Sequence, residues 1–106
     1  MLLAFSIAPQ TSDKSDGSVS QAVAAAIKVV RESGLPTETN SMFTTIEGEW
    51  DEVMGVVKRC VDVVAEHTSR ISLVMKADIR PGYTGEITAK VERVNAILGT
   101  EDPKLS

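Results

Sequence analysis

Aromatic, cysteine and histidine residues are all scarce in this sequence, and each scarcity excludes a class of structure. Aromatic residues make up only 4% of the 106 residues, so the core has to be aliphatic, built from Val, Ile, Leu and Ala. The single cysteine, Cys60, excludes an intramolecular disulfide and a Cys-rich metal site. The single histidine, His67, excludes a metal site made of several histidines. We therefore expect no metal centre and no cofactor.

Clustered positive charge and long apolar runs are also missing. The formal net charge is −4 at pH 7, which argues against a nucleic-acid binder and against binding to anionic membrane surfaces. No stretch approaches the roughly 18 apolar residues that a membrane span needs. The apolar start, residues 1–8, lacks the basic segment of a secretory signal and ends at Pro9. We expect a strand there, and a cytoplasmic protein.

The overall composition is that of an ordinary globular domain. Hydrophobic residues make up 42% and charged residues 25%. A chain of this length forms one domain, which we place at residues 1–99, followed by a short tail at residues 100–106. A domain this small buries roughly two-thirds of its unfolded surface at best. Self-association is a natural way for it to bury more.

Hydrophobic periodicity predicts four strands and three helices. Short or alternating apolar runs favour strands, and apolar residues at helical spacing favour amphipathic helices. Gly34 and Gly99 supply stop signals for the first and third helices, and Thr84 is the expected cap of the third. The strands are expected at residues 2–8, 37–42, 44–48 and 70–80, and the helices at residues 18–33, 49–67 and 85–98.

This order predicts an α+β domain with a split βαβ arrangement, the ferredoxin-like βαββαβ sandwich, and an additional C-terminal helix. Right-handed crossovers place the first and third strands side by side in the middle of an antiparallel four-stranded sheet. The fourth strand then lies beside the first, and the second lies beside the third. Both crossover helices cover the same face of the sheet.

The uncovered face of this sheet is neither a core nor a plain solvent face. The helices are expected to cover Leu3, Phe5, Ile7, Ile46 and Leu73. The other face then presents Ala4, Ser6, Thr45, Glu47, Val74, Lys76 and Asp78. Two interpretations are open: an interface between copies of the chain, with satisfied polar pairs, or a ligand pocket oriented by its polar side chains.

The richest segment runs from Thr44 to Asp51, where two hydroxyls and a carboxylate lead straight into a helix. Acidic residues at a helix start are explained by the helix dipole alone, and Trp50 is expected to anchor the helix to the core. Glu47 is harder to explain, because a strand carboxylate over a sheet face usually has a partner. No phosphate-binding loop, nucleophile elbow or zinc signature is present, and we identify no catalytic residue.

The segment Thr44-Thr45-Ile46-Glu47-Gly48-Glu49-Trp50-Asp51-Glu52-Val53-Met54 resembles the YkoF-like thiamine-binding family of small proteins. The first strand, Phe5-Ser6-Ile7-Ala8-Pro9, and the helix exit, Glu32-Ser33-Gly34-Leu35, are similar to that family too. The resemblance extends over residues 2–98. It implies a ferredoxin-like fold with an extra C-terminal helix, and assembly through the sheets into a homodimer or homotetramer. It also implies non-catalytic binding of thiamine or its hydroxymethylpyrimidine part.

A ligand of this kind would be a cation carrying an aminopyrimidine ring. Glu47 or Asp78 could offset its charge, and the hydroxyls of Ser6, Thr44 and Thr45 could hold the ring nitrogens. Phe43 departs from the family pattern, and it could stack on the ligand or fill its space. Only Lys76 on this face could bind a phosphate, which favours the unphosphorylated ligand.

A second hypothesis treats the protein as an oligomeric regulatory or scaffold module. The free face is then only an assembly interface, with Glu47 paired to Lys76 across it. An enzyme is a third hypothesis, but no nucleophile and base occur together at a recognisable spacing.

Overall fold

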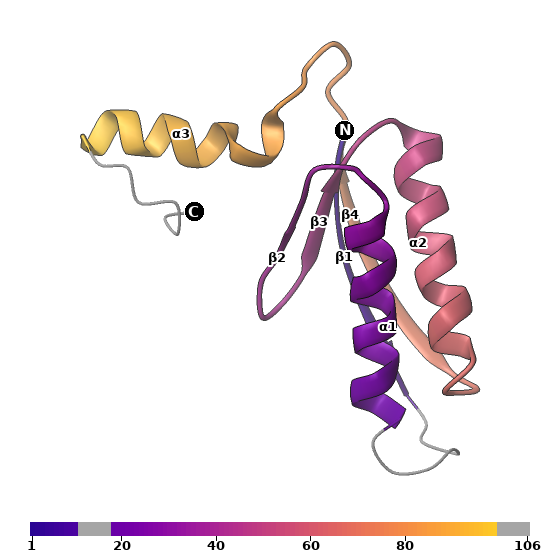
Figure 1. Ribbon diagram of the computed structural model, residues 1–106. Coiled ribbons are helices and arrows are strands. Elements are labelled where there is room, and N and C mark those ends of the chain that lie inside the picture. Colours follow the sequence, from indigo (N-terminus) through magenta and orange to yellow (C-terminus); the bar gives the residue numbers. More distant parts are fainter. Residues whose placement is uncertain (11–17, 100–106) are drawn as a thin grey trace.

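The computed structural model describes residues 1–10 and 18–99 (Figure 1). Residues 11–17, together with the tail expected at residues 100–106, lie outside this part of the chain. Within it, the elements are β1 (Leu2–Pro9), α1 (Ser18–Glu32), β2 (Thr37–Thr39), β3 (Thr44–Glu47), α2 (Trp50–Ala65), β4 (Ile71–Asp78) and α3 (Glu86–Leu98).

The strands form an antiparallel sheet in the order β2-β3-β1-β4, which confirms the predicted topology. Leu3 of β1 pairs with Ile46 of β3 on one side and with Ala77 of β4 on the other. Directly paired residues point to the same face, so this register fixes which side chains share a face. Leu3, Phe5 and Ile46 lie on the face toward α1 and α2, as predicted.

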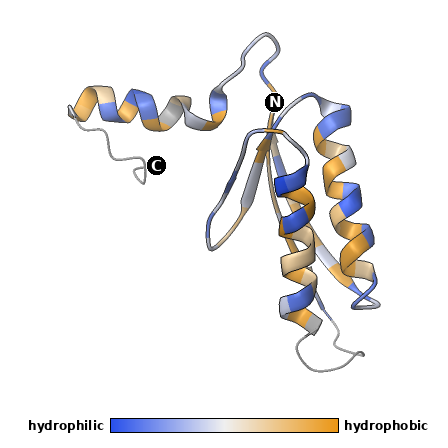
Figure 2. Cartoon of the chain, viewed as in Figure 1, coloured by the Kyte–Doolittle hydropathy of each residue, from blue (hydrophilic) through white to orange (hydrophobic). Residues whose placement is uncertain are grey.

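Helices α1 and α2 lie side by side against this face and seal the core (Figure 1). Each helix turns an apolar stripe toward the sheet and a polar surface toward solvent (Figure 2). The core is aliphatic apart from Phe5 and the Cys60 thiol, and its buried members are Leu3, Phe5, Ala22, Ala26, Val30, Ile46, Val53, Val56, Val57, Cys60 and Val64. Burial raises the pKa of the Cys60 thiol to about 11, so the thiol stays protonated near neutral pH.

Element boundaries differ from the prediction where side chains compete for backbone hydrogen bonds. Strand β2 stops at Thr39, because the Asn40 side chain organises the turn that follows. Helix α2 has Glu49 as its N-cap, in a reciprocal capping box with Glu52. The predicted cap of α3, Thr84, is wrong: the N-cap is Gly85, with φ of +70°. Glycine adopts this angle without strain.

Trp50 does not anchor α2 to the core. Its side chain is 56% exposed at the first position of the helix. Among residues 1–10 and 18–99, no helix combines the length and the apolar character needed to cross a bilayer.

Candidate functional site

A pocket of about 190 Å³ opens between α1 and the β2–β3 hairpin, on the helix side of the sheet. One wall is the apolar flank of α1, and the other is the hairpin with the strand β1 beside it. Its described lining residues are Phe5, Ser6, Ile7, Val23, Ala26, Ile27, Val30, Thr39, Asn40, Ser41, Met42, Phe43 and Thr44. A concave, mostly apolar site with a few polar groups is the usual form of a small-molecule site.

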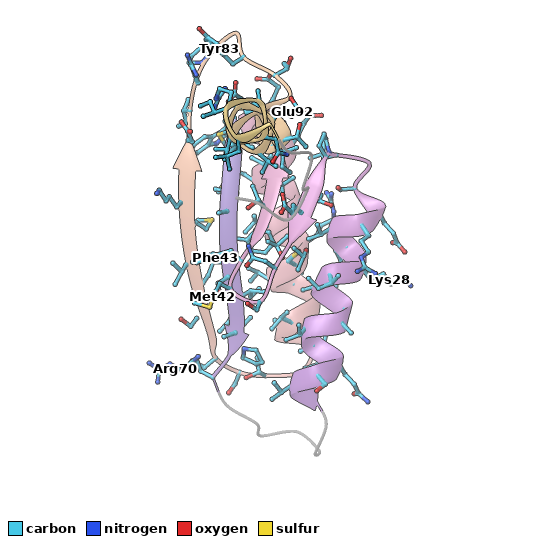
Figure 3. The ribbon with its side chains drawn as sticks, turned by 90° about the vertical axis from the view of Figure 1, so that its left-hand side faces the viewer. Lys28, Met42, Phe43, Arg70, Tyr83 and Glu92 are labelled. Carbon is cyan, nitrogen blue, oxygen red and sulfur yellow. The ribbon has the colours of Figure 1, made fainter. Side chains whose placement is uncertain are left out.

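The hairpin turn is held rigid by one asparagine. The Asn40 Oδ1 atom accepts hydrogen bonds from the backbone N–H groups of Met42 and Phe43, at 2.8 and 2.9 Å. The Asn40 N–H donates to the Phe43 carbonyl at 3.0 Å. These bonds fix Phe43, which is half-buried at the pocket, while Met42 is 71% exposed at the turn (Figure 3). A site on such a turn is largely pre-formed.

Two threonine hydroxyls meet inside this pocket. Thr39 and Thr44 are directly paired across the hairpin, and their Oγ1 atoms lie 3.2 Å apart in a hydrogen bond. One of the two hydroxyl hydrogens makes this bond, so the other remains available, together with free oxygen lone pairs. The pair therefore presents one donor and acceptors side by side to a ligand.

The described lining of the pocket contains no ionisable side chain. A phosphate group would need Arg or Lys donors, and a cation in a dry site would need a carboxylate. The pocket therefore suits an uncharged, planar, partly polar group, held by hydroxyls and packed against aliphatic and aromatic side chains.

The structure divides the six residues that the sequence singled out. Phe43 and Thr44 line this pocket; Ser6 borders it from β1, but its pairing with Val74 puts its side chain on the free face, and Thr45, Glu47 and Asp78 do not line it. Thr44 is buried on the helix side of β3, and Thr45 points to the opposite face, level with Ala4 of β1. The pocket residues that the sequence prediction missed are Phe5 and Ile7 of β1, the hairpin residues Thr39, Asn40, Ser41 and Met42, and the α1 wall. The hairpin register, with its tight turn at residues 41–43, was the signal that could have paired Thr39 with Thr44.

Glu47 has a structural partner, the N-terminus of α3. Its side chain is only 7% exposed, and its two carboxylate oxygens accept the backbone N–H groups of Glu86 and Ile87, each at 3.1 Å. These are N–H groups of the first helical turn, which has no acceptors within the helix, and a carboxylate there is also favoured by the helix dipole. Glu47 therefore caps the N-terminus of α3, which is the role that the sequence predicted for Thr84.

Replacing Glu47 with glutamine should loosen α3 from the sheet. The amide keeps one acceptor but turns an N–H₂ group toward a second backbone N–H, so that N–H loses its partner. We expect backbone hydrogen exchange at Glu86 and Ile87 to accelerate roughly tenfold. Glu38→Gln, an exposed change on the same sheet face, should leave that exchange unaltered. Equal protection of Glu86 in both variants would contradict the role of the Glu47 carboxylate.

The described part of the chain offers neither a metal site nor a reactive thiol. Residues 1–10 and 18–99 contain no cluster of His, Cys, Asp and Glu side chains suited to a metal ion. The Cys60 thiol is buried under α1, where it donates a long hydrogen bond to the Ala26 carbonyl, 3.5 Å from sulfur to oxygen. A thiol in that position, with a raised pKa, is a packing group rather than a nucleophile.

The chain is a small ferredoxin-like domain with a pocket between α1 and the β2–β3 hairpin, and comparison with known proteins gives its family. The sequence model of the family described as "Thiamine-binding protein" matches residues 3–95. The chain belongs to this family, which confirms the resemblance seen in the sequence.

Relatives occur in organisms as different as Mycobacterium bovis and Methanocaldococcus jannaschii. A UPF0045 protein of Mycobacterium bovis is 48% identical over 99 residues, covering 92% of this chain and 94% of the relative. A solved domain of unknown function from Bacillus cereus is 33% identical with a TM-score of 0.75, covering 87% of this chain and 86% of that one. A solved protein of Thermotoga maritima, described as a candidate thiamine biosynthesis or salvage protein, is 25% identical with a TM-score of 0.73, covering 88% and 96%.

Proposed function

We propose that this protein is a non-catalytic binding protein for thiamine or its hydroxymethylpyrimidine part. The pyrimidine ring enters the pocket between α1 and the β2–β3 hairpin. The observation that carries the proposal is the hydrogen-bonded hydroxyl pair of Thr39 and Thr44, in a pocket that Phe43 also lines and whose described lining has no ionisable side chain. Membership of the thiamine-binding family supports the choice of ligand.

The hydrogen-bonding pattern of the pyrimidine fits the threonine pair. An aminopyrimidine presents an amino donor next to a ring-nitrogen acceptor. The pair offers a hydroxyl hydrogen to the ring nitrogen and an oxygen lone pair to the amino group. A substituted pyrimidine takes up about the space of four waters at about 30 Å³ each, so one ring fits the 190 Å³ pocket while the rest of thiamine stays at its mouth.

The thiazolium cation is then placed outside the dry part of the pocket. Phe43 and the exposed Met42 lie at the turn beside it and offer a polarisable surface. A cation over an aromatic face is stabilised by about 0.5–2 kcal/mol. The proposal gives no charge-neutralising role to Glu47, because its carboxylate is engaged by α3.

Thr44→Val and Thr45→Val form a matched pair that tests the site. The two residues are neighbours on β3 but point to opposite faces of the sheet. Both changes replace a hydroxyl with a methyl group of similar size. Thr44→Val should weaken thiamine binding roughly 10- to 100-fold, because an amino group of the ligand loses its acceptor. Thr45→Val should bind like the unaltered protein in titration calorimetry.

Equal losses in the two variants, or a loss confined to Thr45→Val, would place the ligand on the free sheet face instead. Thiamine pyrophosphate serves as a second ligand in the same titrations. The pocket holds no basic side chain among its described residues, so the pyrophosphate should bind no more tightly than thiamine.

We also propose that the chain forms a homo-oligomer through the free face of the sheet. This face lies opposite α1 and α2 (Figure 1) and includes Val74, which is 53% exposed, together with Leu2 and Ala4. Leu2 and Ala4 are half-buried, and apolar side chains gathered on an open face are typical of protein interfaces. A dimer that binds neither thiamine nor hydroxymethylpyrimidine would support the scaffold hypothesis in place of the ligand-binding one.

A further inference from the structure

Helix α3 projects from the domain instead of packing along it. Figure 1 shows it leaving the end of the sheet on the side opposite α1 and α2, and Figure 3, turned by 90°, shows it end-on in front of the sheet. Its first turn is held to the body by Glu47 of β3. Its last turn exposes Ile97 (84%) and Leu98 (58%). Two large aliphatic side chains thus stand at the end of a 13-residue arm.

A groove of about 240 Å³ lies near the base of this arm. Three large side chains in its wall are about half exposed: Trp50 (56%), Ile79 (59%) and Tyr83 (50%). The groove is pre-formed, because a Pro-Gly turn with Gly82 at φ +84° closes through the Tyr83 N–H to the Arg80 carbonyl. The Arg80 guanidinium lies 3.6 Å from the centre of the Tyr83 ring. Trp, Tyr and Arg are the residues that most often carry binding energy at protein interfaces.

The end of the arm and the groove cannot meet within one chain. The groove lies near the first turn of α3, and Ile97 and Leu98 lie at the last, about 20 Å away along the helix. A second copy removes this difficulty. Two sheets packed face to face lie about 10 Å apart, so an arm about 20 Å long extends roughly 10 Å past the partner's sheet. That distance reaches the helix layer, at the end where α2 begins with Trp50.

We propose that α3 is an exchanged arm: Ile97 and Leu98 of one copy pack into the groove of Trp50, Ile79 and Tyr83 on a second copy. A two-fold axis along the strands keeps both arms at the same end of the dimer, and each copy gives and receives one arm. Arg80 then faces the C-terminal end of the incoming helix, whose last carbonyls lack partners within the helix and favour a cation. This inference rests on the proposed pairing of two copies through their free sheet faces. It adds the side chains that hold the two copies together.

The fluorescence of Trp50 reports on the groove directly, because Trp50 is the single tryptophan of the chain. In the unaltered protein at dimer-forming concentration, its emission should be blue-shifted like that of a buried indole. Ile97→Asp should shift the emission to the red and weaken dimerisation at least tenfold in sedimentation equilibrium. Thr88→Asp adds the same charge at an exposed position near the start of α3, and should change neither property.

A cross-linking experiment tests the exchange without relying on a destabilised variant. Ile97→Cys and Tyr83→Cys proteins are purified separately, mixed and oxidised with copper phenanthroline. The native Cys60 is buried and stays unreactive. We expect a disulfide-linked dimer from the mixture and none from either variant alone.

The outcomes separate the two proposals. A wild-type protein that sediments as a monomer overturns both the sheet pairing and the exchanged arm. A stable dimer whose Trp50 emission is that of an exposed indole, and whose mixture gives no cross-link, overturns the arm alone and leaves the groove to a different partner protein.

Discussion

Replacing Val23 with tryptophan should abolish thiamine binding. Val23 lines the pocket from α1 but is 40% exposed, so a larger side chain can be accommodated without disturbing the core. The indole would occupy the space that the pyrimidine ring needs. We expect a loss of affinity of roughly 100-fold or more in titration calorimetry, because a filled pocket cannot bury the ring.

Val19→Trp is the matched control for this prediction. Val19 lies one turn earlier on α1, is 47% exposed and is not part of the pocket. The same substitution there should leave affinity within about twofold. If Val19→Trp and Val23→Trp bind thiamine equally well, the ligand does not enter the pocket between α1 and the hairpin.

Replacing Ile46 with alanine should cause a large loss of stability. Ile46 is fully buried on the central strand β3, where α1 and α2 close over the sheet. Truncation of a buried isoleucine removes apolar contacts and leaves a cavity, which costs about 2–5 kcal/mol. The free energy of unfolding in urea, measured at one fixed protein concentration, should fall by that amount.

The exposed Val19→Ala change provides the comparison for Ile46→Ala. It should alter the free energy of unfolding by less than about 0.5 kcal/mol. A small effect of Ile46→Ala would mean that the sheet and the helices do not form one cooperative core around that residue.

The fold was predictable because its signals are local and agree with one another. The alternation around Phe5 and Ile46 identifies the buried face of each strand, and Gly34 marks the end of α1 at a φ of +78°. The crossover rule then leaves one strand order, which the structure confirms. Membership of the thiamine-binding family also followed from residues that are contiguous in the sequence.

The candidate site was only half predictable, because it depends on contacts between distant segments. Thr44 and Thr45 look alike in the sequence, yet a shift of one residue along a strand sends the side chain to the other face. Glu47 lies 39 residues from Glu86, and nothing local indicates that its carboxylate caps α3. The predicted end of β2 was wrong for a related reason. The Asn40 side chain accepts the backbone hydrogen bonds of the turn, so the strand ends at Thr39.

The most direct test of the account follows the backbone amide signals of isotopically labelled protein during titration with thiamine. Binding in the proposed pocket should shift the signals of residues 23–30 of α1 and residues 39–44 of the hairpin. The signals of Ser72 and Val74 on β4, beside the free sheet face, should stay in place. Shifts confined to Ser72, Val74 and Thr45 would contradict the site, and the absence of any saturable shift would contradict thiamine binding itself.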